Sequence, residues 1–308
     1  MRLARLAEAI VEAVLTLAER EASRAHGRLP GIVGEGSGLA LLGYGSLGAA
    51  ELGFASDLDL VFLYDGALAQ VESDGARPLD GQRYYARIAQ KVVHLLSTLT
   101  RAGRLYEVDV RLRPDGGKGL LVTSLQAFSE YQRERAWTWE HQALVRARPV
   151  AGDALLGRRF TLARAALLGA PRNADEVRTQ VGAMRRRWRG DRDRSTAQLL
   201  DLKQGLGGLL DIEFLLQAQV LAHSATWPAL LDATGTGELI HVCRRIGVLD
   251  EAQAQALHVA HALFLDRALT CTLDARSRIA PRDAALDAAT ADIARICTQL
   301  QLDFASAP

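Results

Sequence analysis

The sequence is poor in cysteine, and its few cysteines form no recognisable pattern. Cys243, Cys271 and Cys297 all lie in the second half of the chain, and no CxxC pair occurs. Small metal fingers and disulfide-rich secreted folds need cysteines in such pairs at short spacing. The pattern therefore predicts free, buried thiols in a protein of a reducing compartment, which indicates the cytoplasm.

Long apolar runs are missing as well. No uninterrupted apolar stretch approaches the roughly 18 residues that a membrane-spanning helix needs. The first 25 residues are rich in apolar side chains, but Glu8, Glu12, Glu19 and Glu21 interrupt them. That pattern is typical of an amphipathic helix and not of a signal peptide. The sequence therefore predicts no membrane partner.

An excess of either charge is also absent. The chain has 37 Lys and Arg against 36 Asp and Glu, and residues 1–150 alone are as evenly balanced. Proteins that bind long nucleic acids usually carry a basic excess, so we expect no nucleic-acid partner. The chain also lacks the P-loop, the Rossmann GxGxxG, the GxSxG elbow and the HExxH zinc motif.

The apolar periodicity changes near Gly152 from a mixture of strands and helices to helices almost alone. Before this point the sequence predicts helices over 2–25, 82–101 and 124–150 (broken near Trp137), two strands within 41–64, and a hairpin within 106–123. After it the sequence predicts a short strand near 199–202 and helices over 153–168, 173–189, 208–223, 235–246, 250–275 and 282–304. We therefore predict an α+β fold: residues 1–160 form a mixed sheet flanked by helices, and residues 161–308 form an all-α domain.

The stretch 41–64, LLGYGSLGAAELGFASDLDLVFLY, carries the first chemical signal. It predicts a strand, a glycine-rich turn and a second strand that opens with Asp57 and Asp59. Residues two apart in a strand project from the same face, so the two acids face one way while Leu58 and Leu60 face the other. Two carboxylates beside a flexible turn suit a divalent metal next to a phosphate better than they suit a core.

A third acid, Asp109, lies in a later segment (106–113) where apolar and charged residues alternate strictly. If this strand lies beside the one that carries Asp57 and Asp59, the three carboxylates converge. Hard oxygen ligands suit Mg²⁺, and two such ions roughly 4 Å apart hold both the attacking and the leaving oxygen of a phosphoryl displacement. Together these features predict metal-dependent nucleotide chemistry.

The same segments offer candidate phosphate ligands. Arg111 and Arg113 share the predicted face of Asp109, and the GYGSLG turn offers backbone N–H groups and the Ser46 hydroxyl. Ser56 is a further nucleotide-binding candidate, although we favour a turn-shaping role over a nucleophilic one. Lys203, in the helical half, is the last candidate that can reach a phosphate.

Several of these features also have structural interpretations that stay open. A charged strand face is common on half-buried strands, and a DxD pair by itself is a weak signal. His94 and His141 fall within predicted helices, where packing or surface roles are favoured over catalysis. The arginine-dense run MRRRWRGDRDR (184–194) is either a solvated helix end or a docking surface for an acidic partner or phosphates.

Taken together, the motifs resemble a known family. Over residues 38–223 they are, in order, GYGSLGAAELGFASDLDLVFLYD, YEVDVRLRPDGGKGLLVTS, AWTWEHQALVRARPVAGD and LKQGLGGLLDIEFLLQ. The glycine turn, the DLD pair and the third acid resemble the DNA polymerase β-type nucleotidyltransferase superfamily. The four motifs together resemble the glutamine synthetase adenylyltransferase family, specifically its C-terminal, adenylylating half.

The resemblance implies transfer of AMP from ATP to a tyrosine hydroxyl of glutamine synthetase with release of pyrophosphate, a reaction that regulates nitrogen assimilation. It implies that Asp57 and Asp59 bind two Mg²⁺ (or Mn²⁺) ions, and that Asp109 completes the site and helps to activate the tyrosine oxygen. Gly45 and Ser46 would hold the triphosphate. Glutamine synthetase is then the protein partner, and the PII signal protein is a candidate regulator.

The sequence departs from the family in two ways. Family members usually have lysine where this chain has Ser46, which predicts altered nucleotide affinity and not inactivity. The chain also matches only half of the usual length, which is compatible with a fragment or with a split gene. Within the helical half, Gly207, Gly208, Asp211 and Glu213 match a family signature to which the sequence assigns no catalytic role.

Three alternative functions stay open. The first is the related phosphorolytic removal of AMP from modified glutamine synthetase, and the second is uridylyl transfer to the PII protein, which uses the same type of site. The third is a non-catalytic module that binds a regulatory partner, which the intact set of three acids disfavours.

Overall fold

The computed structural model describes residues 2–31 and 37–305, so part of the turn-rich connector predicted over 27–38 lies outside the described residues. The chain divides into two compact units, Met1–Leu167 and Leu168–Pro308. The predicted boundary at 160/161 falls a few residues earlier, within a helix. Among the described residues, none of the helices has both the length and the apolar character needed to cross a membrane.

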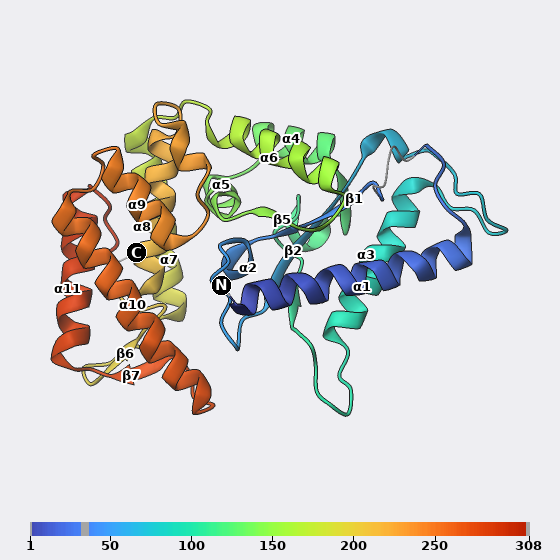
Figure 1. Cartoon of the computed structure of the whole chain (residues 1–308). Coiled ribbons are helices and arrows are strands. Elements are labelled where there is room, and N and C mark those ends of the chain that lie inside the picture. Colours follow the sequence, from blue (N-terminus) through green and yellow to red (C-terminus); the bar gives the residue numbers. More distant parts are fainter. Residues whose placement is uncertain (1, 32–36, 306–308) are drawn as a thin grey trace. The chain divides into compact units, whose positions relative to one another are not determined.

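The first unit is a mixed sheet with helices on both faces (Figure 1). Its elements in chain order are α1 (Arg2–His26), β1 (Leu39–Gly43), α2 (Gly45–Gly48), β2 (Leu58–Tyr64), η1 (Gly66–Leu68), α3 (Gly81–Ser97), β3 (Val108–Asp109), η2 (Gly116–Lys118), β4 (Val122–Ser124), α4 (Leu125–Glu134), α5 (Thr138–Val145), β5 (Arg148–Gly152) and α6 (Ala154–Leu168). The strand order is β3-β2-β1-β5, and β4 also pairs with β2. The chain thus has the α+β fold that the sequence predicts.

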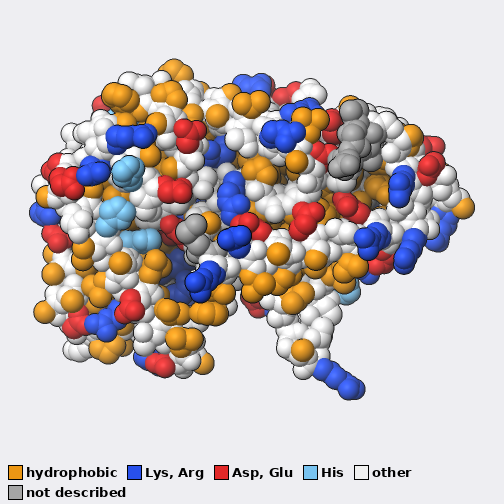
Figure 2. Space-filling model, viewed as in Figure 1, with side chains coloured by type: hydrophobic (Ala, Val, Ile, Leu, Met, Phe, Trp, Pro, Cys, Tyr) orange, Lys and Arg blue, Asp and Glu red, His pale blue; other side chains and the backbone are white. Residues whose placement is uncertain are grey.

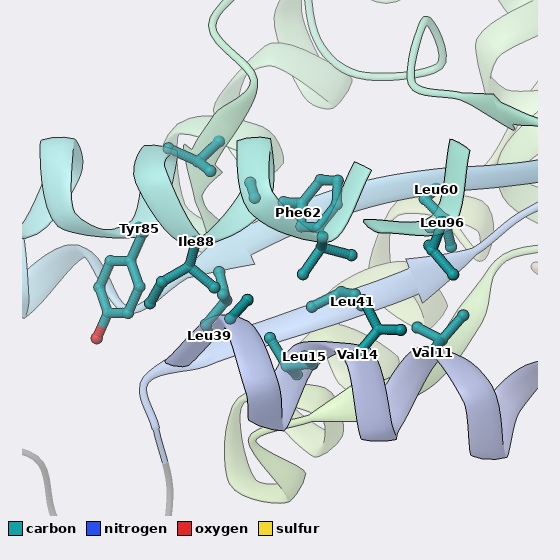
Figure 3. Packing of buried hydrophobic residues seen from close by; sticks show 14 of the residues in the cluster. Val11, Val14, Leu15, Leu39, Leu41, Leu60, Phe62, Tyr85, Ile88 and Leu96 are labelled. Carbon is teal, nitrogen blue, oxygen red and sulfur yellow. The ribbon is translucent and has the colours of Figure 1, made fainter. Parts of the chain in front are cut away.

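Both faces of this sheet are covered by helices, because successive side chains of the strands point to opposite faces and are apolar on each. Leu60 and Phe62 of β2 pack with Leu41 of β1 against Val14 of α1 and Ile88 of α3 (Figure 3). The intervening β2 side chains are also buried, and Figure 1 shows α4 and α6 on the sheet face away from α1 and α3. Because β2 is apolar on both faces beyond its start, polar chemistry is confined to the end where it begins.

Helix caps fix several of the predicted boundaries. Asp80 caps α3 by accepting a hydrogen bond from the Arg83 N–H, and Ser124 caps α4 by accepting one from the Ala127 N–H. The predicted interruption near Trp137 is confirmed, since α4 and α5 are separate helices. However, α5 ends at Val145 and not at residue 150 as predicted, because residues 148–152 pair with β1 as an edge strand.

The predicted hairpin within 106–123 is wrong. Only Val108–Asp109 forms a strand, and Val122–Ser124 pairs in parallel with β2 and not with its supposed hairpin partner. The strand ends after Asp109 because its carboxylate accepts the Arg111 N–H at 2.8 Å, and Arg113 donates to the carbonyl oxygens of Val110 and Gly119. These local hydrogen bonds curl the chain into turns where alternation predicted an extended strand.

A projecting loop joins α3 to β3 and leads directly into Asp109 (Figure 1). Thr100 and Gly103 close its tip by exchanging backbone hydrogen bonds of 3.0 and 3.1 Å. Figure 2 shows a basic side chain at the end of this projection. The base of the loop is fixed to the sheet, because the Leu58 N–H donates to the Glu107 carbonyl at 2.9 Å.

The second unit is almost wholly helical, as the sequence predicts. Its elements are α7 (Ala174–Arg192), β6 (Leu199–Asp201), α8 (Leu209–His223), η3 (Pro228–Leu231), α9 (Thr236–Arg245), α10 (Glu251–Leu273), β7 (Ile279–Pro281) and α11 (Ala284–Gln299). The short strand predicted near 199–202 is confirmed and pairs antiparallel with β7, which the sequence did not reveal. From Leu209 to Leu221 every residue of α8 except Glu213 is buried, so α8 is the core helix of this unit.

Cys243, Cys271 and Cys297 are free and buried, in agreement with the sequence. All three lie in the helices of the second unit, on α9, α10 and α11. Burial raises the pKa of the Cys243 thiol to about 12, so this side chain packs as a small neutral group and is not a reactive thiolate.

Candidate active site

The glycine-rich turn between β1 and β2 brings backbone directly against a carboxylate. Gly45 has a φ of +52°, a conformation that favours glycine. A Cβ added at this position would lie 2.4 Å from Oδ2 of Asp59. The turn is also bonded to β2 at this point, because the Tyr44 N–H donates to the Asp59 carbonyl at 2.9 Å. Glycine is therefore required here so that the turn can approach the Asp59 side chain.

The sheet register brings two of the three predicted acids together. Strands β2 and β3 are parallel, with Leu58 opposite Val108 and Asp59 opposite Asp109. Neighbouring strands lie about 4.8 Å apart and residues in register project from the same face, so the two carboxylates are neighbours. Asp57 lies one residue before β2 begins and is exposed. The two acidic strands are therefore neighbours, which is the condition on which convergence of the acids depends.

Arg111 faces all three acids and holds one of them. Its Nε lies 3.0 and 2.9 Å from the two carboxylate oxygens of Asp109. Hydrogen bonding with Asp109 raises the pKa of the Arg111 guanidinium, and the negative charges of Asp59 and Asp57 raise it further by smaller amounts. The same hydrogen bonds lower the pKa of Asp109, although partial burial opposes the shift. Asp109 is therefore ionised at neutral pH.

The acids form an open site and not a closed metal cage. Among residues 2–31 and 37–305, no group of three or more Asp, Glu, His or Cys side chains is already arranged to hold a metal ion. Mg²⁺ commonly takes only one or two carboxylates from the protein and completes its shell with water and substrate phosphate. The hard oxygen donors of Asp57, Asp59 and Asp109, beside a turn with no Cβ at Gly45, fit such an ion.

The remaining candidate residues of the first unit have local partners. Arg113 donates to the carbonyls of Gly119 at 3.2 Å and Gly117 at 3.4 Å, so its guanidinium holds the loop after Asp109, and its positive charge also lowers the pKa of Asp109. The Ser56 hydroxyl accepts the Gly53 N–H at 3.1 Å, as a turn-shaping residue does. Ser46 is half-buried within α2, on the turn that contacts Asp59.

The two histidines that the sequence singled out also make local contacts. The exposed His94 lies 3.2 Å from the Thr98 hydroxyl through Nδ1, and Nε2 of His141 lies 2.8 Å from the Gln132 carbonyl. Both contacts fit the packing and surface roles that we favour for them.

Lys203 and the family signature belong to the second unit. The Lys203 N–H donates to Asp201 at 3.0 Å, in the turn before α8. Asp211 is only 1% exposed and accepts Nε of Arg185 at 2.6 Å and the Gly207 N–H at 2.6 Å. Burial raises the pKa of Asp211, and Arg185 opposes the shift. Asp211 of the family signature thus joins Arg185 of α7 to Gly207, and these buried hydrogen bonds fix the turn before α8 to α7.

The arginine-dense run of α7 is partly engaged by the end of the chain. Arg186 donates to the Asp303 carbonyl at 2.6 Å, and Arg189 donates to the carbonyls of Phe304 and Ala305. Arg192 lies over the Trp188 ring, 5.1 Å from its centroid. Much of the run therefore binds this chain's own backbone and aromatic side chains.

The sequence missed three residues that support the glycine turn. Arg146 bonds to Glu51 just after the turn, and Arg148 bonds to the carbonyls of Leu47 and Gly48 within it. The available signal was a pair of arginines two residues apart, the second directly before Pro149, within the motif AWTWEHQALVRARPVAGD.

Comparison with known proteins gives the family. A model described as glutamate-ammonia ligase adenylyltransferase matches residues 1–163, and one described as GlnD PII-uridylyltransferase matches residues 176–278. The first match falls within the first unit, and the second match falls within the second unit.

Individual relatives match nearly the whole chain. Proteins named bifunctional glutamine synthetase adenylyltransferase/adenylyl-removing enzyme are 55% identical over 99% of this chain in Stenotrophomonas maltophilia (strain K279a) and 55% identical over 92% in Xanthomonas axonopodis pv. citri. One from Nitrosococcus oceani is 46% identical over 84%. The matches cover 32%, 30% and 27% of these relatives, so the chain spans about a third of their length or slightly less. The chain belongs to the glutamate-ammonia ligase adenylyltransferase family.

Proposed function

We propose that this chain transfers AMP from ATP to a tyrosine hydroxyl of glutamine synthetase and releases pyrophosphate. The observation that carries the proposal is the register of Asp59 with Asp109 beside the Gly45 turn. This arrangement places two carboxylates and an open stretch of backbone at one point, in a family whose curated members are named for this adenylylation.

The three acids have distinct parts in the proposal. Asp57, Asp59 and Asp109 would hold Mg²⁺ or Mn²⁺, which when bound polarises phosphate oxygens and offsets their negative charge. Because the pKa of Asp109 is lowered, this carboxylate is a weak proton acceptor. We assign Asp109 the orientation of the tyrosine oxygen, which bonds to the α-phosphorus as the bond to pyrophosphate breaks and the phenolic proton leaves to solvent.

The turn and the arginine complete the proposed site. Gly45 presents its backbone to the triphosphate. The Ser46 hydroxyl adds a hydrogen-bond donor for the phosphates at the position where family members usually have lysine. Arg111 is exposed, so its guanidinium can leave Asp109 for a phosphate when nucleotide binds. Arg113 and Ser56 would act through the loops that they hold, and Lys203 stays a candidate phosphate ligand of the second unit.

The test is incubation of this chain with glutamine synthetase, ATP labelled in its α-phosphate and Mg²⁺. We expect label on a synthetase tyrosine and release of unlabelled pyrophosphate. No label on the synthetase, while a full-length relative labels it in parallel, would count against the proposal.

The names of the relatives favour one second candidate, the removal of AMP from modified glutamine synthetase by phosphorolysis. Incubation of modified synthetase with phosphate and this chain tests it, and release of ADP would support it. The match of residues 176–278 to the PII-uridylyltransferase model motivates a further control in which UTP and PII protein replace ATP and synthetase. The same mixtures test whether PII alters the AMP-transfer rate, as a regulator would.

A further inference from the structure

Two arginines that follow α5 lie directly behind the glycine turn. Arg146 is the C-terminal cap of α5, and Arg148 opens β5. In the antiparallel pairing of β5 with β1, Arg148 stands opposite Gly43, the last residue before the turn. The register therefore delivers both side chains to the turn on the edge of the sheet.

Arg148 binds the turn through two backbone carbonyls. Its Nε donates to the Gly48 carbonyl at 2.8 Å, and its Nη2 donates to the Leu47 carbonyl at 3.1 Å. The same Nη2 also contacts the Glu8 carboxylate of α1. A planar guanidinium can bridge several acceptors at once, which a lysine ammonium at the same place cannot do with one fixed geometry. Arg148 thus joins α1, β5 and the end of α2.

Arg146 supports the turn by a charge pair and by close packing. Its side chain is 6% exposed, and its Nη2 donates to Oε2 of Glu51 at 2.7 Å. Its backbone lies against the turn as well, since a Cβ added at Gly48 would lie 1.8 Å from the Arg146 carbonyl oxygen. A pair this buried is costly to break, so it fixes the chain that leaves α2.

We propose that Arg146 and Arg148 are positioning residues that hold the Gly45–Gly48 turn against Asp59 and so set the affinity for the nucleotide triphosphate. The turn is held from two sides. On one side the Tyr44 N–H donates to the Asp59 carbonyl at 2.9 Å. On the other side Arg148 bonds to the carbonyls of Leu47 and Gly48, and Arg146 bonds to Glu51. The inference rests on the proposed function, because it assigns this turn to the triphosphate. Neither arginine is a catalytic residue in it.

The test compares Arg148→Gln, Arg148→Lys and the unchanged 308-residue chain. We expect Arg148→Gln to raise the Kd for MgATP and the KM for ATP by about 10- to 100-fold, as loss of an outer supporting contact commonly does. We expect an unchanged KM for glutamine synthetase, because the contacts that Arg148→Gln removes are contacts within the turn itself. Arg148→Lys keeps the charge but cannot bridge both carbonyls, so its ATP affinity falls between the other two.

The matched control is Arg159→Gln. Arg159 pairs with Asp65 at 2.7 Å in the same unit, and that pair is more exposed and lies at the far end of β2. We expect its ATP affinity to equal that of the unchanged chain. In a double-mutant cycle, Ser46→Ala and Arg148→Gln should be non-additive for ATP affinity, because a displaced turn no longer presents the hydroxyl.

Hydrogen exchange separates this inference from the proposed function. The amides of Gly48, Ala49 and Glu51 donate within the turn at 2.9, 3.1 and 2.8 Å. Faster exchange at these amides in Arg148→Gln, but not in Arg159→Gln, together with weaker ATP binding supports the positioning role. Unchanged exchange or unchanged ATP affinity in Arg148→Gln overturns it.

Failure of the proposed function gives a different result. If the unchanged chain binds MgATP but labels no synthetase, AMP transfer is overturned while the variant series still decides the role of the arginines. If the unchanged chain binds no ATP, the assignment of the turn to the triphosphate is overturned as well, whatever the exchange data show about the turn itself.

Discussion

Each unit of this chain contains a glycine in a left-handed turn closely linked to an aspartate, and the two pairs differ in every other respect. Gly45 has φ +52° and contacts Asp59, and Gly207 has φ +73° and donates its N–H to Asp211. Asp59 is half-buried at an open edge of the sheet, whereas Asp211 is 1% exposed and paired with Arg185. Burial and partners therefore distinguish the two aspartates: Asp211 is a packing residue, and the half-buried Asp59 is the one to which we assign chemistry.

The largest expected effect comes from Asp59→Asn or Asp57→Asn. Each removes a metal-binding charge from the proposed site, so AMP transfer should fall about 10,000-fold, which corresponds to ~5 kcal/mol of transition-state stabilisation. The calorimetric unfolding transitions should stay in place, because neither carboxylate is fully buried. Rates near those of the unchanged chain would contradict the assignment of these aspartates to a metal site.

Asp211→Ala should show the opposite behaviour. It leaves the guanidinium of Arg185, which is fully buried, without its carboxylate, and such a loss typically costs about 3–5 kcal/mol of stability. The measurement is hydrogen exchange in α7 and α8, and the control is Asp191→Ala, which changes an exposed aspartate of α7. Equal protection in both variants would mean that the buried pair does not hold this unit together.

A matched pair of glycine substitutions sharpens the contrast. In Gly45→Ala the new methyl group meets the Asp59 carboxylate, which can swing aside, so beyond the left-handed backbone strain that both variants share we expect mainly a loss of ATP affinity. In Gly207→Ala it meets the backbone of Thr290, 2.5 Å from the carbonyl oxygen, so the strain of about 1–3 kcal/mol appears as lost stability. ATP titration and thermal unfolding of both variants test this, and an exchange of the two phenotypes would contradict it.

The smallest expected effect is on the titration of Asp109. Arg111→Gln removes the hydrogen bonds that lower its pKa, so the pKa should rise in the variant. Because the pKa of Asp109 is lower in the folded state than in the unfolded chain, its ionisation stabilises the fold at pH values above the unfolded pKa. This stabilisation is lost as the pH falls through the pKa of the folded state. Because Arg111 is exposed, the variant should lose only about 0–1 kcal/mol. Carboxyl ¹³C titration by NMR measures the shift, and an unchanged pKa would rule out this partner.

Much of the first unit could be predicted because its signals are local. The apolar faces of β2 and α1, the cap at Asp80 and the turn at Gly45 each follow from a few neighbouring residues. The adjacency of Asp59 and Asp109 was a condition that the local signals left open, and the register of β2 with β3 meets it.

The errors arose where side chains compete with the backbone ladder or where the partner is distant. Strict alternation over 106–113 suggested a long strand, but Asp109 and Arg113 form local hydrogen bonds that end it. The edge strand that begins at Arg148 and the role of that residue depend on β1 and α1, more than 100 residues away in the chain. No local sequence pattern predicts contacts between residues so far apart in the chain.

The most direct test of the difference between the two aspartates is Mn²⁺ binding followed by electron paramagnetic resonance in the presence of ATP. We expect the unchanged chain and Asp211→Asn, if it folds, to bind Mn²⁺ with ATP, and Asp59→Asn and Asp109→Asn to lose this binding while their unfolding transitions stay in place. Full Mn²⁺ binding by a folded Asp59→Asn variant would contradict the assignment of the metal site to Asp57, Asp59 and Asp109.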